Sequence, residues 1–178
     1  IHAQPGMPAQ LIAESERELC RTVDLVFTTS PELQASLMPL NVCTYYYGNV
    51  ADQAHFSAAL DVPPAPAQLA DLSKPRLMFV GAIDAYKLDL PMLTTLARRR
   101  SDWSFVLVGP VGETDPETSI DVLRALPNVH VMGLQAYADL PAWLAHADVA
   151  LLPLQDNTYT QHMFPMKFFE YLAAGRPV

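Results

Sequence analysis

The sequence predicts an α/β fold in which most of the chain forms a doubly wound, Rossmann-like parallel sheet. From residue 75 onward, short uninterrupted apolar runs alternate with segments of helical periodicity. Apolar runs without polar alternation are typical of strands in a parallel sheet that helices cover on both faces. Of the 178 residues, 51% are hydrophobic and only 17% are charged, so a packed core is expected and disorder is not.

Four buried strands are expected after residue 75, and helices separate them. The strands are predicted over 77–80, 105–108, 129–132 and 149–152. The helices are predicted over 91–100, 117–126 and 139–147, and a last helix carrying Glu170 follows a loop over 153–164. If the first and fourth strands are neighbours, the loops that follow them face each other at the point where the winding reverses, which is where open parallel sheets bind ligands.

The first third of the chain predicts a smaller α/β unit. A helix is expected over 11–21, a strand over 25–30, a second helix from Pro31 and a strand over 41–47. A break over 48–52 follows, and three prolines between residues 63 and 66 stiffen a connector.

Composition excludes several function classes. The net charge of −8 and only 11 basic residues argue against nucleic acid as a partner, because backbone binding needs a dense basic surface. Cys20 and Cys43 lack metal-ligand spacing, so we expect reduced thiols and neither a zinc site nor a disulfide framework. No apolar run approaches the roughly 20 residues that span a bilayer, and the start lacks both Met and signal-peptide features. We expect a cytoplasmic chain that lacks its natural start and end.

The segment 164–178 carries the clearest functional signal. It places Pro165 at a helix start, Glu170 a turn and a half further on, and Gly175 just past the helix end. Free N–H groups at such a start attract anions, and a carboxylate beside them can accept hydrogen bonds from hydroxyls. This combination resembles the donor-binding helix of the family 4 (group 1) glycosyltransferases, which are retaining enzymes of the two-Rossmann-domain architecture known as GT-B.

Other segments resemble that family in the same order along the chain, so the resemblance covers roughly residues 20–178. They correspond to the end of its N-terminal domain, a variant of its hinge, its first phosphate-side loop and its fourth strand–helix–strand unit. The matching segments are 24–33, 47–52, 79–87 and 128–153.

The resemblance implies a division into three parts. Residues 1–47 would be a remnant of the N-terminal acceptor domain, 48–74 a hinge and connector, and 75–178 a donor-binding domain lacking its C-terminal end. With the acceptor domain incomplete, the chain alone is expected to bind nucleotide without transferring sugar, because transfer needs donor and acceptor aligned in one cleft.

The resemblance also implies the reaction. The intact enzyme would transfer a sugar with retention from a UDP- or GDP-linked donor to an acceptor hydroxyl, in the synthesis of cell-surface polysaccharide or glycolipid. Its partners would be the nucleotide sugar and an acceptor glycan or lipid-linked sugar. The intact enzyme would act in the cytoplasm or at the inner face of the membrane, although this segment itself indicates no membrane association. No cofactor and no metal are expected.

Two residues would carry the central donor contacts in this family. Glu170 would accept hydrogen bonds from the ribose hydroxyls, whereas a purely structural Glu would favour the helix dipole and pair with Lys167. Lys87, six residues after Gly81, would contact the diphosphate, although the family's arginine directly after the glycine is Ala82 here. The alternative for Lys87 is an exposed loop lysine.

The remaining candidates surround the same expected anion. Lys167 and the N–H groups of Met166 and Lys167 would stabilise the diphosphate at the helix start, where Pro165 replaces the family's usual glycine. Gly81 would border the diphosphate. His162 falls where many members have the first glutamate of a Glu-x7-Glu pair, and an exposed loop histidine is the alternative.

Two other functions remain open from the residues alone. A flavodoxin-like or receiver-like binding domain would share the winding, but it predicts acidic or flavin-loop chemistry at the first strand ends, where only Asp84 is found. A sugar-nucleotide epimerase of the same fold would need catalytic carboxylates and a histidine that the sequence does not place.

Overall fold

The protein consists of two compact units. The computed structural model describes residues 6–178. Residues up to 50 together with 155–165 form the first unit, and residues 51–154 together with 166–178 form the second. No helix in the described part of the chain is long and apolar enough to cross a membrane.

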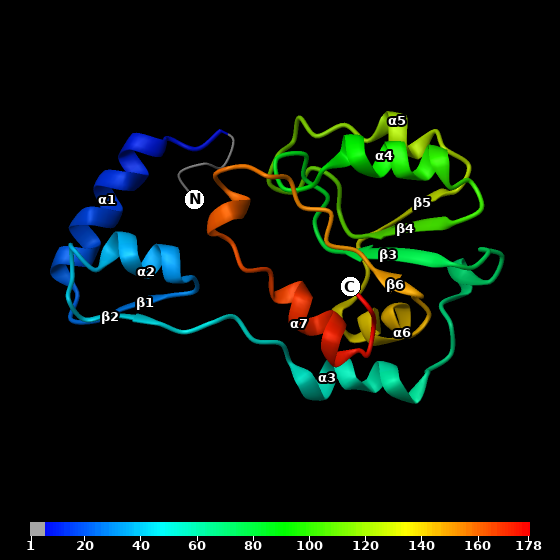
Figure 1. The fold of residues 1–178 in the computed structure, drawn as a ribbon, viewed down its shortest axis with the longest axis horizontal. Helices are drawn as coiled ribbons and strands as arrows, with labels where there is room; N and C mark the ends of the chain where they lie inside the picture. The colour runs from blue at the N-terminus through cyan, green and yellow to red at the C-terminus, as the bar shows by residue number, and fades with distance from the viewer. Residues whose placement is uncertain (1–5) are drawn as a thin grey trace. The chain divides into compact units, whose positions relative to one another are not determined.

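The first unit contains a two-stranded parallel sheet with helices. Strand β1 pairs with β2, so that Phe27 lies opposite Tyr45. Helix α2 begins at Pro31, and the Ser30 side chain caps it by accepting a hydrogen bond from the Leu33 N–H at 3.1 Å. The elements are α1 (Ala9–Thr22), β1 (Val26–Thr28), α2 (Pro31–Leu37), β2 (Thr44–Tyr46) and the 3₁₀ turn η4 (Thr160–His162) (Figure 1).

The second unit is built on a four-stranded parallel sheet with the order β5-β4-β3-β6. The strands are β3 (Arg76–Val80), β4 (Ser104–Val108), β5 (Val129–Gly133) and β6 (Val149–Ala150). Leu77 pairs with Val149, which confirms that the first and fourth of the predicted strands are neighbours. The winding therefore reverses between β3 and β6, and the parallel α/β class predicted from the sequence is confirmed.

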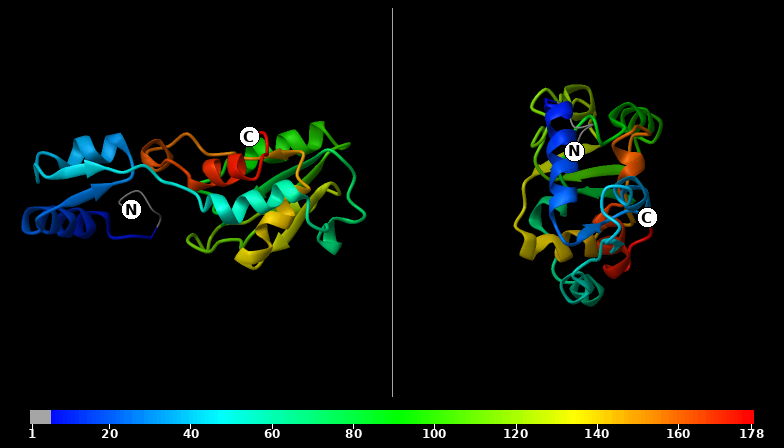
Figure 2. Two further views of the ribbon diagram at one scale, coloured as in Figure 1. Left: turned by 90° about the horizontal axis from the view of Figure 1, so that it is seen from below. Right: turned by 90° about the vertical axis from the view of Figure 1, so that its left-hand side faces the viewer.

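Helices cover both faces of this sheet (Figure 1 and Figure 2). Because side chains alternate along a strand, Leu77 and Phe79 pack in a cluster with α4 and α5, whereas Met78 and Val80 pack in a cluster with α3, α6 and α7. The helices are α3 (Gln53–Ser57), α4 (Leu90–Arg99), α5 (Asp121–Arg124), α6 (Leu140–Ala145) and α7 (Met166–Ala173), with 3₁₀ turns η1 (Ala58–Asp61), η2 (Ala67–Leu69) and η3 (Tyr137–Asp139).

Two helices differ from the prediction. The helix expected over 117–126 is shorter in the structure, where it is α5 alone. The segment before α5 is not helical, and its Thr118 side chain bonds to other loop residues instead. The Thr118 hydroxyl accepts a hydrogen bond from the Ala85 N–H at 2.9 Å and contacts Asp115 at 2.9 Å. Helix α3 lies in the segment predicted as a connector, and it forms because the Asp52 side chain caps it and Phe56 is buried in the core.

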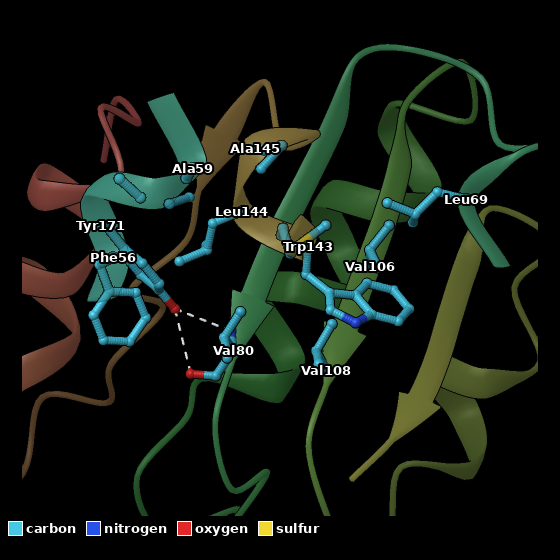
Figure 3. Close-up of a cluster of buried hydrophobic side chains, with 14 residues drawn as sticks. Phe56, Ala59, Leu69, Val80, Val106, Val108, Trp143, Leu144, Ala145 and Tyr171 are labelled. Atoms are coloured by element: carbon cyan, nitrogen blue, oxygen red, sulfur yellow. Dashed lines mark hydrogen bonds between the residues drawn. The ribbon is translucent and has the colours of Figure 1, made fainter. Parts of the chain in front are cut away.

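The core holds α7 in place through two buried hydrogen bonds between Tyr171 and Val80 (Figure 3). Tyr171 is fully buried. Its hydroxyl accepts a hydrogen bond from the Val80 N–H at 2.9 Å and donates one to the Val80 carbonyl at 3.4 Å. Burial also raises the pKa of Tyr171, so the phenol stays neutral. The helix that carries Lys167 and Glu170 is thereby fixed to the end of β3.

Replacing Tyr171 by Phe should lower the free energy of unfolding by about 1–2 kcal/mol, because the Val80 N–H then stays buried without an acceptor. Urea unfolding followed by circular dichroism measures this loss. Tyr137→Phe is the control, since Tyr137 is 54% exposed and its substitution should change stability by about 0.5 kcal/mol at most. Equal midpoints for the Tyr171→Phe variant and the parent would contradict the prediction.

Candidate functional site

The candidate site lies at the carboxyl ends of β3 and β4, where two glycines extend the sheet. The Gly81 N–H donates to the Val108 carbonyl at 2.8 Å, and the Gly109 N–H donates to the Gly133 carbonyl at 2.8 Å. Gly81 and Gly109 both have φ of +145°, a conformation that side chains rarely adopt. The two glycines therefore allow the backbone to continue the ladder and to lie close to its neighbours.

Lys167 lies directly over Gly81. A Cβ placed on Gly81 would be 2.6 Å from Lys167 Nζ, so the lysine side chain occupies the space that a side chain at Gly81 would need. Within residues 6–178 the Lys167 ammonium forms no hydrogen bond or ion pair. The structure thus brings together two of the residues that the sequence assigned to one anion.

The pKa of Lys167 lies below that of an ordinary lysine. Burial lowers its pKa, and the nearby Lys87 acts in the same direction, whereas Glu170 and Glu113 act against the shift. A half-buried ammonium without a hydrogen-bonding acceptor is costly. An anion above Gly81 would supply the missing acceptor.

Glu170 lies on α7, three residues after Lys167, and is half-buried. Burial raises the pKa of its carboxyl, and the nearby Lys167 and His55 partly offset the rise. In the part of the chain that the structure describes, its carboxylate accepts no hydrogen bond. It is an acceptor group available to hydroxyl donors.

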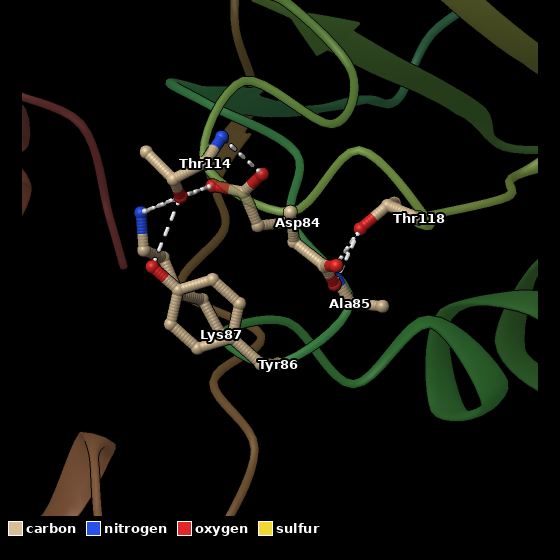
Figure 4. Close-up of polar contacts among 7 residues, drawn as sticks. Asp84, Ala85, Tyr86, Lys87, Thr114 and Thr118 are labelled. Atoms are coloured by element: carbon tan, nitrogen blue, oxygen red, sulfur yellow. Dashed lines mark hydrogen bonds and ion pairs between the residues drawn. The ribbon is translucent and has the colours of Figure 1, made fainter. Parts of the chain in front are cut away.

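Lys87 is held in a network instead of standing as an exposed loop lysine. Its ammonium lies 3.0 Å from Asp84 Oδ2 and 3.1 Å from Thr114 Oγ1 (Figure 4). Burial alone would lower the pKa of Lys87, but Asp84 and Tyr86 outweigh it and the pKa is raised. Lys87 is therefore a fixed cation, and Asp84 partly balances its charge.

An aromatic pair beside Glu170 was not found from the sequence. The rings of His55 and Tyr137 stack with centroids 4.3 Å apart, and His55 Nε2 lies 2.9 Å from the Tyr137 carbonyl oxygen. Burial, Asp52 and Glu170 raise the pKa of Tyr137, which places it in the electrostatic neighbourhood of Glu170. Tyr137 lies four residues after the end of β5, and this position beyond a strand end could have indicated a site residue from the sequence. Nothing in the sequence of the connector distinguishes His55.

Two predicted site residues belong to the first unit. His162 is exposed, and its Nδ1 lies 2.8 Å from the Thr158 carbonyl within the same loop. Pro165 ends that unit, and Met166, which is exposed, begins α7 in the second. The structure therefore groups Gly81, Lys87, Lys167 and Glu170 in one unit. No cluster of three or more metal-ligating side chains occurs in residues 6–178.

Two sequence comparisons match this chain to glycosyltransferases. Residues 74–178 match the family described as Glycosyl transferases group 1. A curated relative from Bacillus subtilis (strain 168), named "Putative teichuronic acid biosynthesis glycosyltransferase TuaH", is 38% identical over 102 residues, which are 57% of this chain and 25% of that protein.

The fold resembles that of Anabaena Alr3699/HepE. The structure of HepE with UDP has a TM-score of 0.71 at 17% identity, and the match covers 99% of this chain and 50% of HepE. The structure of HepE with UDP and glucose has a TM-score of 0.70 at 18% identity, covering 96% and 48%. The chain thus spans about half of HepE and a quarter of the curated relative. Because the family match covers more than half of the sequence, the chain belongs to the group 1 glycosyl transferases.

Proposed function

We propose that the second unit is the nucleotide-sugar donor site of a retaining glycosyltransferase. The observation that carries this proposal is the unpaired Lys167 ammonium over Gly81, with Glu170 one turn further along α7. A diphosphate above Gly81 would pair with Lys167, and the ribose hydroxyls would donate to Glu170. The predicted roles of Lys167, Lys87, Glu170 and Gly81 are kept in this proposal.

The proposed chemistry is departure of a nucleoside diphosphate from the sugar. Negative charge grows on the leaving diphosphate in the transition state, and preorganised cations stabilise it. Lys167 would be the principal counter-charge, because Lys87 is partly balanced by Asp84. The N–H groups at the start of α7 would add their partial positive charge.

The relatives support the choice of donor and product class. HepE has been crystallised with UDP and with UDP-glucose, so we propose UDP as the first nucleotide to test and GDP as the second. The name of the curated relative supports an acceptor in cell-surface polysaccharide synthesis. The family match favours transfer over the flavodoxin-like and epimerase alternatives.

Substitution of Glu170 tests the donor site. Glu170→Ala should weaken binding of both UDP and uridine by about 1–2 kcal/mol, because both ligands carry the ribose hydroxyls. Glu170→Gln should lose less, since its amide oxygen still accepts hydrogen bonds. Isothermal titration of the full-length protein measures both ligands.

The control is Glu117→Ala, because Glu117 is an exposed carboxylate of the same unit. It should bind UDP as the parent does. If Glu170→Ala also bound UDP with the parent's affinity, Glu170 would be a helix-dipole residue and the donor-site assignment would fail. A parent protein that bound neither UDP nor GDP would refute the proposed function as a whole.

A further inference from the structure

Asp84 is a buried carboxylate that pairs with Lys87, one of the two lysines of the proposed site. Its side chain is 0% exposed. Its oxygens accept hydrogen bonds from the Thr114 N–H at 3.1 Å, from the Thr114 hydroxyl at 2.5 Å and from the Lys87 ammonium at 3.0 Å. A buried carboxylate is stable as an ion only when it is paired and hydrogen-bonded, and Asp84 meets both conditions.

The charge state of Asp84 follows from this geometry. Burial would raise its pKa, but the hydrogen bonds from Thr114 and Lys87 outweigh burial and hold the pKa below its usual range. Asp84 is therefore a carboxylate at neutral pH, and the raised pKa of Lys87 keeps its partner an ammonium.

Asp84 also connects two loops. It lies in the loop after β3, whereas Thr114 lies in the loop after β4. The Tyr86 hydroxyl lies 3.0 Å from Thr114 Oγ1, and the Lys87 ammonium lies 5.1 Å from the centre of the Tyr86 ring. The Lys87 side chain is thus surrounded by fixed partners, although 21% of it remains exposed (Figure 4).

The positive charge of Lys87 also affects Lys167. It is close enough to lower the pKa of Lys167 by repulsion. Glu113, next to Thr114 in the connected loop, also acts electrostatically on Lys167. The residues that hold Lys87 and Thr114 therefore contribute to the electrostatic environment of Lys167.

We propose that Asp84 is a positioning residue that holds the Lys87 ammonium in place to bind the diphosphate of the donor. The inference rests on the proposed function and deepens it. A free lysine side chain loses rotamer entropy when it binds an anion, and a lysine already held by Asp84 and Thr114 has lost that freedom before binding. Asp84 acts through Lys87 and touches no ligand itself.

A double-mutant cycle in the full-length protein tests this role. Asp84→Asn keeps the shape and an acceptor for Thr114 but removes the charge that holds Lys87. It should weaken UDP binding about five- to tenfold and leave uridine binding unchanged, because uridine has no phosphate. In the Lys87→Ala background, Asp84→Asn should have no further effect on UDP.

Thr118→Val is the matched control. Thr118 joins the same two loops through the Ala85 N–H but does not contact Lys87. It should bind UDP and uridine as the parent does. If Asp84→Asn does not fold, Thr114→Val provides the second test, because it removes the hydroxyl that bonds both Asp84 and Lys87; UDP binding should then fall about threefold.

Several outcomes would overturn the inference. The first is an equal loss of affinity for UDP and for uridine in Asp84→Asn. The second is a loss of UDP affinity on Asp84→Asn that is as large in the Lys87→Ala background as in the parent. The third is UDP binding that is unchanged or tighter in Asp84→Asn. These outcomes would leave the proposed function intact if the parent binds UDP or GDP. A parent that binds neither would refute both.

Discussion

Replacing Gly109 by alanine is expected to lower the free energy of unfolding by about 3–5 kcal/mol. Its Cβ would collide with the carbonyl group of Gly81, which is backbone and cannot turn aside. The φ of +145° adds strain for any residue with a side chain. Urea unfolding followed by circular dichroism measures the loss.

Gly81→Ala is the informative partner, because Gly81 has the same φ of +145°. Its Cβ would meet only the end of the Lys167 side chain, which is flexible and can move. We therefore expect a smaller loss of stability, about 1–3 kcal/mol, together with a strong loss of UDP binding because Lys167 is displaced. Equal stability losses in the two variants would contradict this account of the strand ends.

The sheet was predictable because its strands carry their signal locally. Residues 77–80 and 105–108 are apolar throughout, which is what a strand covered on both faces requires. The proximity of Gly81 to Lys167 followed from one further rule, that ligand sites lie where the winding reverses. Pairing of Leu77 with Val149 places that reversal where it was expected.

The polar network was not predictable because its partners are distant in sequence. Asp84 and Thr114 are 30 residues apart, and each lies in a loop without periodicity. The sequence therefore showed Lys87 as a lone cation and Asp84 as a lone carboxylate. Helix α3 was missed for a related reason: the prolines after residue 62 indicate a connector, while the burial of Phe56 depends on α6 and α7.

Lys167→Ala is expected to weaken UDP binding by about 2–3 kcal/mol while uridine binding stays unchanged. The loss should be larger than that caused by Lys87→Ala, because Asp84 already balances the charge of Lys87. Lys74→Ala is the control: Lys74 is an exposed lysine of the same unit that pairs with Asp148 at 3.4 Å. It should bind UDP like the parent. Titration calorimetry with both ligands separates phosphate contact from damage to the fold.

The pH dependence of UDP binding gives a second measurement of the same residue. The lowered pKa of Lys167 means that its ammonium loses its proton at a lower pH than an ordinary lysine does. The anion binds the protonated form, so affinity should be full below that pKa and fall as the pH rises through it. The range from about pH 8 upward is informative, because phosphate is then fully ionised. Lys167→Arg should remove the fall, since a guanidinium stays charged. Two results would show that Lys167 does not bind the diphosphate. One is the same fall of UDP affinity with pH in Lys167→Arg, and the other is an equal loss of uridine and UDP affinity in Lys167→Ala.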